Sequence, residues 1–225
     1  MKNSYRRLAV LLICAAAMTM LLLTGCGPKK PTAEDAQNYV KAVIDIMCTG
    51  DYDHSVKLAD IEEGKETEMR DAAIEEMLDT VTANQPLSDE VKSEFKDVLI
   101  KAFGKAKYTV GEATETGEGE YDVVVTIEPL KVYDGVGDKV TAEINDKNAQ
   151  DPTFFVSMPE EDRFNYIMSS LIKYMDEGLD SPTYSDPVDV TVHYGLIDEE
   201  NKLYGCDGSE GQLIGEKLFS IEGLE

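Results

Sequence analysis

Side chains suited to acid–base or metal chemistry are few in this chain, which contains only two histidines. His54 stands beside Asp51 and Asp53. These three residues could hold a metal ion, but the spacing fits helix capping better, because the Asp53 carboxylate can accept backbone N–H bonds. His193 falls on the face opposite the apolar alternation of its segment, so we expect it in solvent. Neither histidine belongs to a Ser-His-Asp, phosphate-loop or zinc motif. We therefore predict no catalytic residue and no enzymatic activity.

The four cysteines offer thiol chemistry. Cys14 lies inside an apolar N-terminal run, and Cys26 follows that run directly. Cys48 and Cys206 are the remaining pair. Outside the cytoplasm they could form a disulfide that closes a long loop. The alternative is two separate thiols, one of them buried.

Cys26 ends the tetrapeptide Leu23-Thr24-Gly25-Cys26. Basic residues among the first seven positions precede an uncharged run over 8–23, which is typical of a signal peptide and short of the roughly 20 residues of a membrane span. The tetrapeptide resembles the lipobox of bacterial lipoproteins. That resemblance implies a diacylglyceryl group on the Cys26 thiol and cleavage between Gly25 and Cys26. A plain secretory signal or an uncleaved anchor is the alternative.

These features divide the chain into three parts. Residues 1–25 form the signal peptide, 26–31 a lipidated tether, and 32–225 a single extracytoplasmic domain. Two acyl chains hold a protein firmly on a bilayer, whereas one binds only marginally. We therefore expect the protein on the extracytoplasmic face of the cell membrane, anchored by lipid.

The charge of the chain is strongly acidic, with 45 Asp and Glu against 21 Lys and Arg, a net charge of −24. The signal segment contains only basic charges, so the mature chain is more acidic still. Such a surface is repelled by nucleic acid, and by anionic lipid outside the anchor itself. It suits cations, basic peptides or simple solubility.

Oxygen ligands for calcium gather in two polar segments. One contains Asp146, Asn148 and Asp151, and the other spans 198–201. Neither has the ligand spacing of a calcium-binding helix-loop-helix. A loose extracellular calcium site is left open, and we expect no other cofactor or metal.

Capping residues and apolar periodicity predict the helices. Thr32 and Asp35 form a capping box for a first helix that ends at Gly50. A short second helix follows near 56–59, then helices over 66–83 and from Ser88 to Gly104. A further helix runs over about 159–177, with Ser157 and Glu160 as its capping box.

Twofold alternation predicts the strands. They lie near 108–110, over 121–127 after a turn at 117–119, and over 188–196. Weaker signals suggest continuation at 132–133, a strand at 140–144 before a loop at 145–152, and one or two strands in the Gly-rich tail near 203–219.

Helices followed by a meandering sheet predict an α+β fold, with the helices packed on a curved antiparallel sheet. The order of elements resembles the NTF2-like or cystatin-like fold, and uncharacterised lipoproteins of Gram-positive bacteria that carry such domains. The helix at 159–177 is additional to that fold. By this resemblance the inward-facing Tyr39, Tyr108, Tyr121 and Tyr194 would line a pocket between sheet and helices; otherwise they pack in the core with bonded hydroxyls.

These observations favour a non-catalytic binding module anchored to the membrane through Cys26. Its partner would be an envelope protein or a cationic peptide, as in immunity lipoproteins, and not nucleic acid. The alternatives are a structural or assembly subunit of an envelope complex, and an NTF2-like enzyme. An enzyme would require a buried carboxylate or histidine with a strongly shifted pKa inside a cleft.

Overall fold

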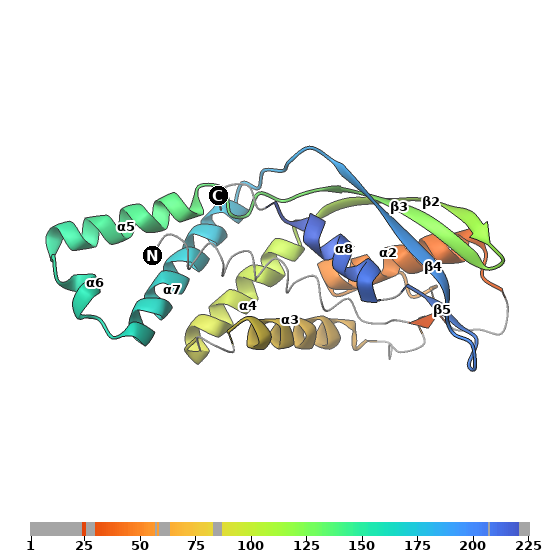
Figure 1. Ribbon diagram of the computed structural model, residues 1–225, viewed down its shortest axis with the longest axis horizontal. Coiled ribbons are helices and arrows are strands. Elements are labelled where there is room, and N and C mark those ends of the chain that lie inside the picture. Colours follow the sequence, from red (N-terminus) through yellow and green to blue (C-terminus); the bar gives the residue numbers. More distant parts are fainter. Residues whose placement is uncertain are drawn as a thin grey trace.

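The computed structural model describes residues 24–25, 30–56, 58, 64–82, 87–206 and 208–220 (Figure 1). Signal residues 1–23, the acylation site Cys26, and residues 57 and 59 of the short helix predicted near 56–59 lie outside this part of the chain, while Val56 and Leu58 are described and are not helical. Within it, no helix is both long enough and apolar enough to cross a membrane.

The first helix of the fold, α2 (Ala33–Thr49), begins and ends where the capping residues predict. Thr32 Oγ1 accepts the Asp35 N–H at 3.2 Å, and the Asp35 carboxylate accepts the Thr32 N–H at 2.8 Å. Gly50 closes the helix in the left-handed conformation, with φ of 73°. Helix α3 (Glu66–Thr82) follows, and α4 (Asp89–Phe103) begins where Ser88 Oγ accepts the Val91 N–H.

An antiparallel sheet covers α2. Its strands are β1 (Thr24–Gly25), β2 (Lys107–Gly117), β3 (Glu120–Glu128), β4 (Val188–Asp198) and β5 (Leu203–Gly205), in the order β1-β5-β4-β3-β2. The sheet curves over α2 and the C-terminal helix (Figure 1). Val123, Val125 and Ile127 of β3 alternate on its inner face and are completely buried. The predicted fold class, helices on a curved antiparallel sheet, is confirmed.

A helical arm is inserted between β3 and β4. It consists of α5 (Val136–Gln150), α6 (Phe154–Ser157) and α7 (Glu160–Leu179), and α7 is the predicted additional helix. The two ends of the arm meet at a neck, where the Lys131 N–H bonds the Thr183 carbonyl and the Ser185 N–H bonds the Pro129 carbonyl, each at 2.9 Å. The arm extends away from the sheet (Figure 1).

Several weaker predictions are wrong. Residues 140–150 form helix α5 and not a strand and a loop, because Val136 and Val140, four residues apart, are the buried positions. The tail contains one of the predicted strands, β5, but continues as α8 (Gly208–Leu218), in which Ile214 and Leu218 are buried at helical spacing. Residues 132–133 lie in a turn. Helix α7 begins at Pro159 without a side-chain cap, so the Ser157–Glu160 box does not form.

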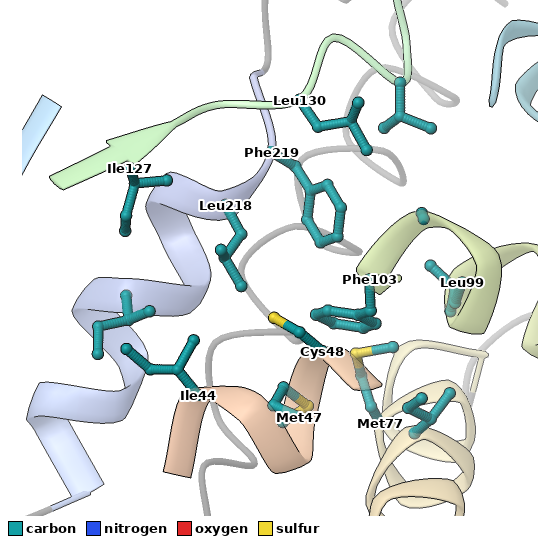
Figure 2. Packing of buried hydrophobic residues seen from close by; sticks show 14 of the residues in the cluster. Ile44, Met47, Cys48, Met77, Leu99, Phe103, Ile127, Leu130, Leu218 and Phe219 are labelled. Atoms are coloured by element: carbon teal, nitrogen blue, oxygen red, sulfur yellow. The ribbon is translucent and has the colours of Figure 1, made fainter. Parts of the chain in front are cut away.

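One part of the core forms where α2, α3, α4 and the end of α8 converge (Figure 2). Cys48 of α2 and Phe103 of α4 both belong to this cluster (Figure 2). The ring of Phe103 meets that of Phe219 edge-on, with the centroids 5.1 Å apart. Burial among these side chains raises the pKa of the Cys48 thiol to about 12, with a smaller contribution from the charge of Asp45. The thiol is therefore a neutral, apolar component of the core.

Two glycines give a matched test of the helix ends. A Cβ at Gly50 would lie 2.8 Å from Arg70 Nη1 at positive φ, whereas a Cβ at Gly178 in α7 meets nothing within 4 Å. We expect Gly50→Ala to lower the free energy of unfolding by about 1–2 kcal/mol. Gly178→Ala is expected to raise it by about 0.5–1 kcal/mol. Urea unfolding of both variants measures this, and equal effects would contradict the assignment of Gly50 as the helix-ending residue.

Candidate functional site

The four tyrosines expected to line a pocket lie between α2 and the sheet. Tyr39 of α2 packs against Tyr194 of β4 with ring centroids 5.1 Å apart, and both are buried. The Tyr121 hydroxyl donates to the Pro31 carbonyl at 2.9 Å. The Tyr108 hydroxyl donates to the Asp45 carboxylate. These contacts belong to core packing, and a ligand pocket at this position stays a prediction.

Cys48 and Cys206 are both free thiols, so the disulfide is absent. The physical reason is their separation along α2. Cys206 directly follows Gly205, which pairs with Gly195 of β4 beside Tyr194, and Tyr194 packs on Tyr39. Cys48 is nine residues further along the same helix, about 13 Å away at the rise of an α-helix. A disulfide requires Cα atoms about 4.4–6.8 Å apart.

The histidines take structural positions. Asp53 Oδ1 accepts the Ser55 N–H at 2.9 Å, and this bond lowers the pKa of Asp53. Because residues 54–56 form a turn, Asp53 closes a turn there and does not cap a helix as predicted. His54 lies 3.3 Å from the Asp51 carboxylate and 3.5 Å from that of Glu66. His193 is exposed on the outer sheet face, 3.0 Å from Asp122.

The polar residues of the two segments considered for calcium belong to a helix, its end and a turn. Asp146 and Asn148 belong to α5, and Asp151 accepts the Thr153 N–H at its end. Asp198 accepts the backbone N–H groups of Glu200 and Asn201 in a turn. Across the part of the chain that the structure describes, no three His, Cys, Asp or Glu side chains are grouped to hold a metal ion.

Two hollows flank α7 in the described part of the chain, and their linings are candidate binding surfaces. The first, here called the acidic groove, lies between α4 and α7 and has a volume of about 360 Å³. Val98 and Ile172 are buried apolar residues of its lining. The charged and polar residues of the groove are Glu94, Asp97, Lys101, Ser169, Lys173 and Asp176.

The acidic groove contains both paired and unpaired carboxylates. Lys101 Nζ bonds Asp176 Oδ1 at 2.6 Å and Asp180 Oδ1 at 3.0 Å, and these bonds raise the pKa of Lys101. Lys101 therefore stays protonated and ties α4 to α7. Glu94 and Asp97 form no ion pair within the described residues, so their charges remain available to a cation.

The second hollow lies between α5 and α7, with a volume of about 510 Å³. Its centre is Glu143 of α5, whose carboxylate accepts bonds from four side chains of α7. The donors are Tyr166 at 2.8 Å, Tyr174 at 2.8 Å, Ser170 at 2.9 Å and Lys173 at 3.2 Å. Burial alone would raise the Glu143 pKa, but these bonds outweigh it and lower the pKa to about 2. Glu143 is thus a fixed anion that joins α5 to α7.

None of these α4, α5 and α7 residues is a site residue expected from sequence. The lining of the acidic groove comes from helices about 70 residues apart in the chain, and Glu143 falls in a segment whose pattern favours a strand. One signal is present in the sequence: Tyr166, Ser170, Lys173 and Tyr174 recur at spacings of three and four, which places polar groups on one helix face.

The fold is similar to that of a candidate lipoprotein of Bacillus subtilis (ycdA), with a TM-score of 0.57 and 14% sequence identity. The match covers 83% of this chain and 56% of that protein, so this chain spans about half its length. At this identity the likeness shows a shared fold alone. No protein-family model and no curated protein matches the sequence.

The Glu143 cluster predicts a pH-dependent contribution to stability. Because the folded pKa of about 2 lies below the ordinary value of 4.5, the contribution is complete above pH 4.5 and is lost as pH falls toward 2. We expect Glu143→Gln to lower the free energy of unfolding at pH 7 by about 1–2 kcal/mol, since the carboxylate is partly solvated.

Urea unfolding at pH 7 and at progressively lower pH measures this contribution, and the deficit should shrink below pH 4.5. The control is Glu177→Gln, which removes an exposed pairing with Lys139 at 3.9 Å and should change stability by less than about 0.5 kcal/mol. A deficit of the same size at every pH would contradict the role assigned to the ionised Glu143.

Proposed function

We propose that the chain is a membrane-anchored lipoprotein, acylated at Cys26, and that its domain is a non-catalytic binding module on the extracytoplasmic face. The module takes cationic peptides, or basic segments of an envelope protein, in the acidic groove between α4 and α7. The observation that carries this proposal is the pair of unneutralised carboxylates, Glu94 and Asp97, above the apolar side chains of Val98 and Ile172.

The start of the fold supports the anchor. The described fold holds the chain at the end of the expected tether, because the Tyr121 hydroxyl donates to the Pro31 carbonyl and Thr32 caps α2. Cleavage after Gly25 would remove β1 and leave a sheet of β5, β4, β3 and β2. The shared fold with the candidate lipoprotein of Bacillus subtilis is in keeping with this arrangement.

The chemistry of the groove supports the ligand class. A basic peptide with alternating apolar residues would place ammonium or guanidinium groups beside Glu94 and Asp97, and apolar side chains against Val98 and Ile172. The net charge of −24 would attract such a peptide over a longer range and repel nucleic acid. Because exposed ion pairs are screened by salt, binding should weaken as ionic strength rises.

The anchor is tested by substitution of the acylated thiol. We expect Cys26→Ser to move the protein from the membrane fraction to the soluble fraction and to abolish incorporation of radiolabelled palmitate, since the thiol is the attachment atom. The control is Cys206→Ser, which removes a different free thiol and should leave both properties unchanged. Palmitate incorporation into Cys26→Ser would contradict the anchor.

The groove is tested by neutralising its free carboxylates. We expect the double variant Glu94→Gln/Asp97→Asn to bind a Lys- and Arg-rich peptide about three- to tenfold more weakly at low salt. The control Glu112→Gln/Glu115→Gln removes the same charge from exposed positions on β2 and should have a smaller effect. Calorimetric titration measures both, and equal losses would show a general charge effect without a groove.

An assembly role is the second candidate, and one observation favours it. Val156 of α6 is 78% exposed, at the end of the arm. A pull-down from native membranes at low and high salt separates the two functions. A protein partner retained at high salt and released by Val156→Asp favours assembly, and a basic peptide retained only at low salt favours capture.

A further inference from the structure

The two sides of the anchor segment lie at one end of the molecule. On one side, in the chain before cleavage, Gly25 of β1 pairs with Tyr204 of β5; in the mature chain the contacts of Lys30 and Pro31 place the anchor segment. On the other, Lys30 forms an ion pair with Glu118 in the β2–β3 turn. Gly119 of that turn connects the two, since a Cβ there would lie 3.2 Å from Tyr204 Cε1 and 3.7 Å from Pro31 Cδ. The chain therefore enters the fold beside both hairpins.

The reach of the tether limits which surface can face a membrane. Pro31 is five residue steps from Cys26, and five steps span at most about 17 Å when the chain is fully extended. A folded domain of this size has a radius of gyration of about 16 Å. Its width exceeds the reach of the tether, so the Pro31 end must stay close to the bilayer and cannot point away from it.

The end that carries Pro31 also exposes apolar side chains. Leu196 and Ile197, at the end of β4, are 42% and 36% exposed, and Leu196 pairs with Tyr204. Lys30 and Lys202 are the exposed cations near them. Glu199 and Glu200 lie in the β4–β5 turn, and their negative charges offset those of the two lysines. The tether and the apolar contacts, and not net charge, must therefore hold this end against lipid.

We propose that this sheet end, formed by the β2–β3 turn and the β4–β5 hairpin, is the membrane-facing surface of the anchored protein and lies in the lipid headgroup layer. The inference rests on acylation of Cys26, as proposed above. It places the arm of α5, α6 and α7 at the far end of the long axis (Figure 1). The acidic groove, whose wall is α7, is then held away from the bilayer and open to soluble peptides.

The sequence provides a clean reporter for this orientation, because the chain contains no tryptophan. The experiment uses the full lipidated protein reconstituted in phosphatidylcholine vesicles that contain a lipid with a nitroxide on its headgroup. Single variants Ile197→Trp and Leu196→Trp report on the sheet end. Val156→Trp reports on the tip of the arm and is the matched control.

We expect fluorescence quenching at Ile197→Trp to be at least about twofold stronger than at Val156→Trp, because the nitroxide reaches groups within the interface layer. Leu196→Trp should behave like Ile197→Trp, and it replaces that variant if Ile197→Trp fails to fold. Lengthening the tether with flexible Gly and Ser residues after Pro28 should reduce the quenching at both positions. Equal quenching at the sheet end and the arm tip, or stronger quenching at Val156→Trp, would overturn the proposal.

The mass of the N-terminal peptide shows whether Cys26 is acylated. This measurement separates a failure of the proposed orientation from a failure of the anchor on which it rests. An acylated, vesicle-bound protein without preferential quenching at the sheet end overturns the orientation and leaves the anchor intact. An unacylated protein that does not bind vesicles overturns both.

Discussion

The packing of α2 into the curved sheet is the contact on which the other elements depend. The buried face of α2 meets the inner sides of β2, β3 and β4, and Tyr39 against Tyr194 is one of its central contacts. At its C-terminal end the same helix supplies Ile44, Met47 and Cys48 to the cluster shared with α3 and α4. A single helix thus joins the sheet to the helical layer, and its two caps set the residues at which this helix begins and ends.

Several lysines of this acidic chain form ion pairs between helices. Lys92 and Lys96 of α4 reach Asp79 and Glu75 of α3, at 2.6 and 3.4 Å. Lys101, on the same helix, reaches α7. Because each such lysine neutralises carboxylates at a helix junction, the excess acid charge is left on the outer surfaces, where repulsion is screened by solvent. The open carboxylates of the acidic groove are one result of this distribution.

The elements that could be predicted from sequence are those fixed by local chemistry. The Thr32 capping box and the Gly50 stop depend on neighbouring residues only, and the alternation over 121–127 continues long enough to identify a strand. The prediction for 136–150 was wrong because three apolar residues at twofold spacing also fit a helix. The burial of Val136 and Val140 identifies the helix, and this burial arises only when a neighbouring helix covers the two side chains. The groove and the Glu143 cluster could not be predicted, since both are made by helices that meet only in the folded chain.

The neck of the arm limits how the length of the insertion can change. The backbone bonds between residues 129–131 and 183–185 bring the two ends of the insertion together, so β3 and β4 keep their register whatever length of chain lies between them. An arm could be extended at its α6 tip during evolution without disturbing a single strand. Shortening is restricted, because α7 packs on α4 and its loss would expose Val98 to water. The arm is therefore free to grow outward but not to disappear.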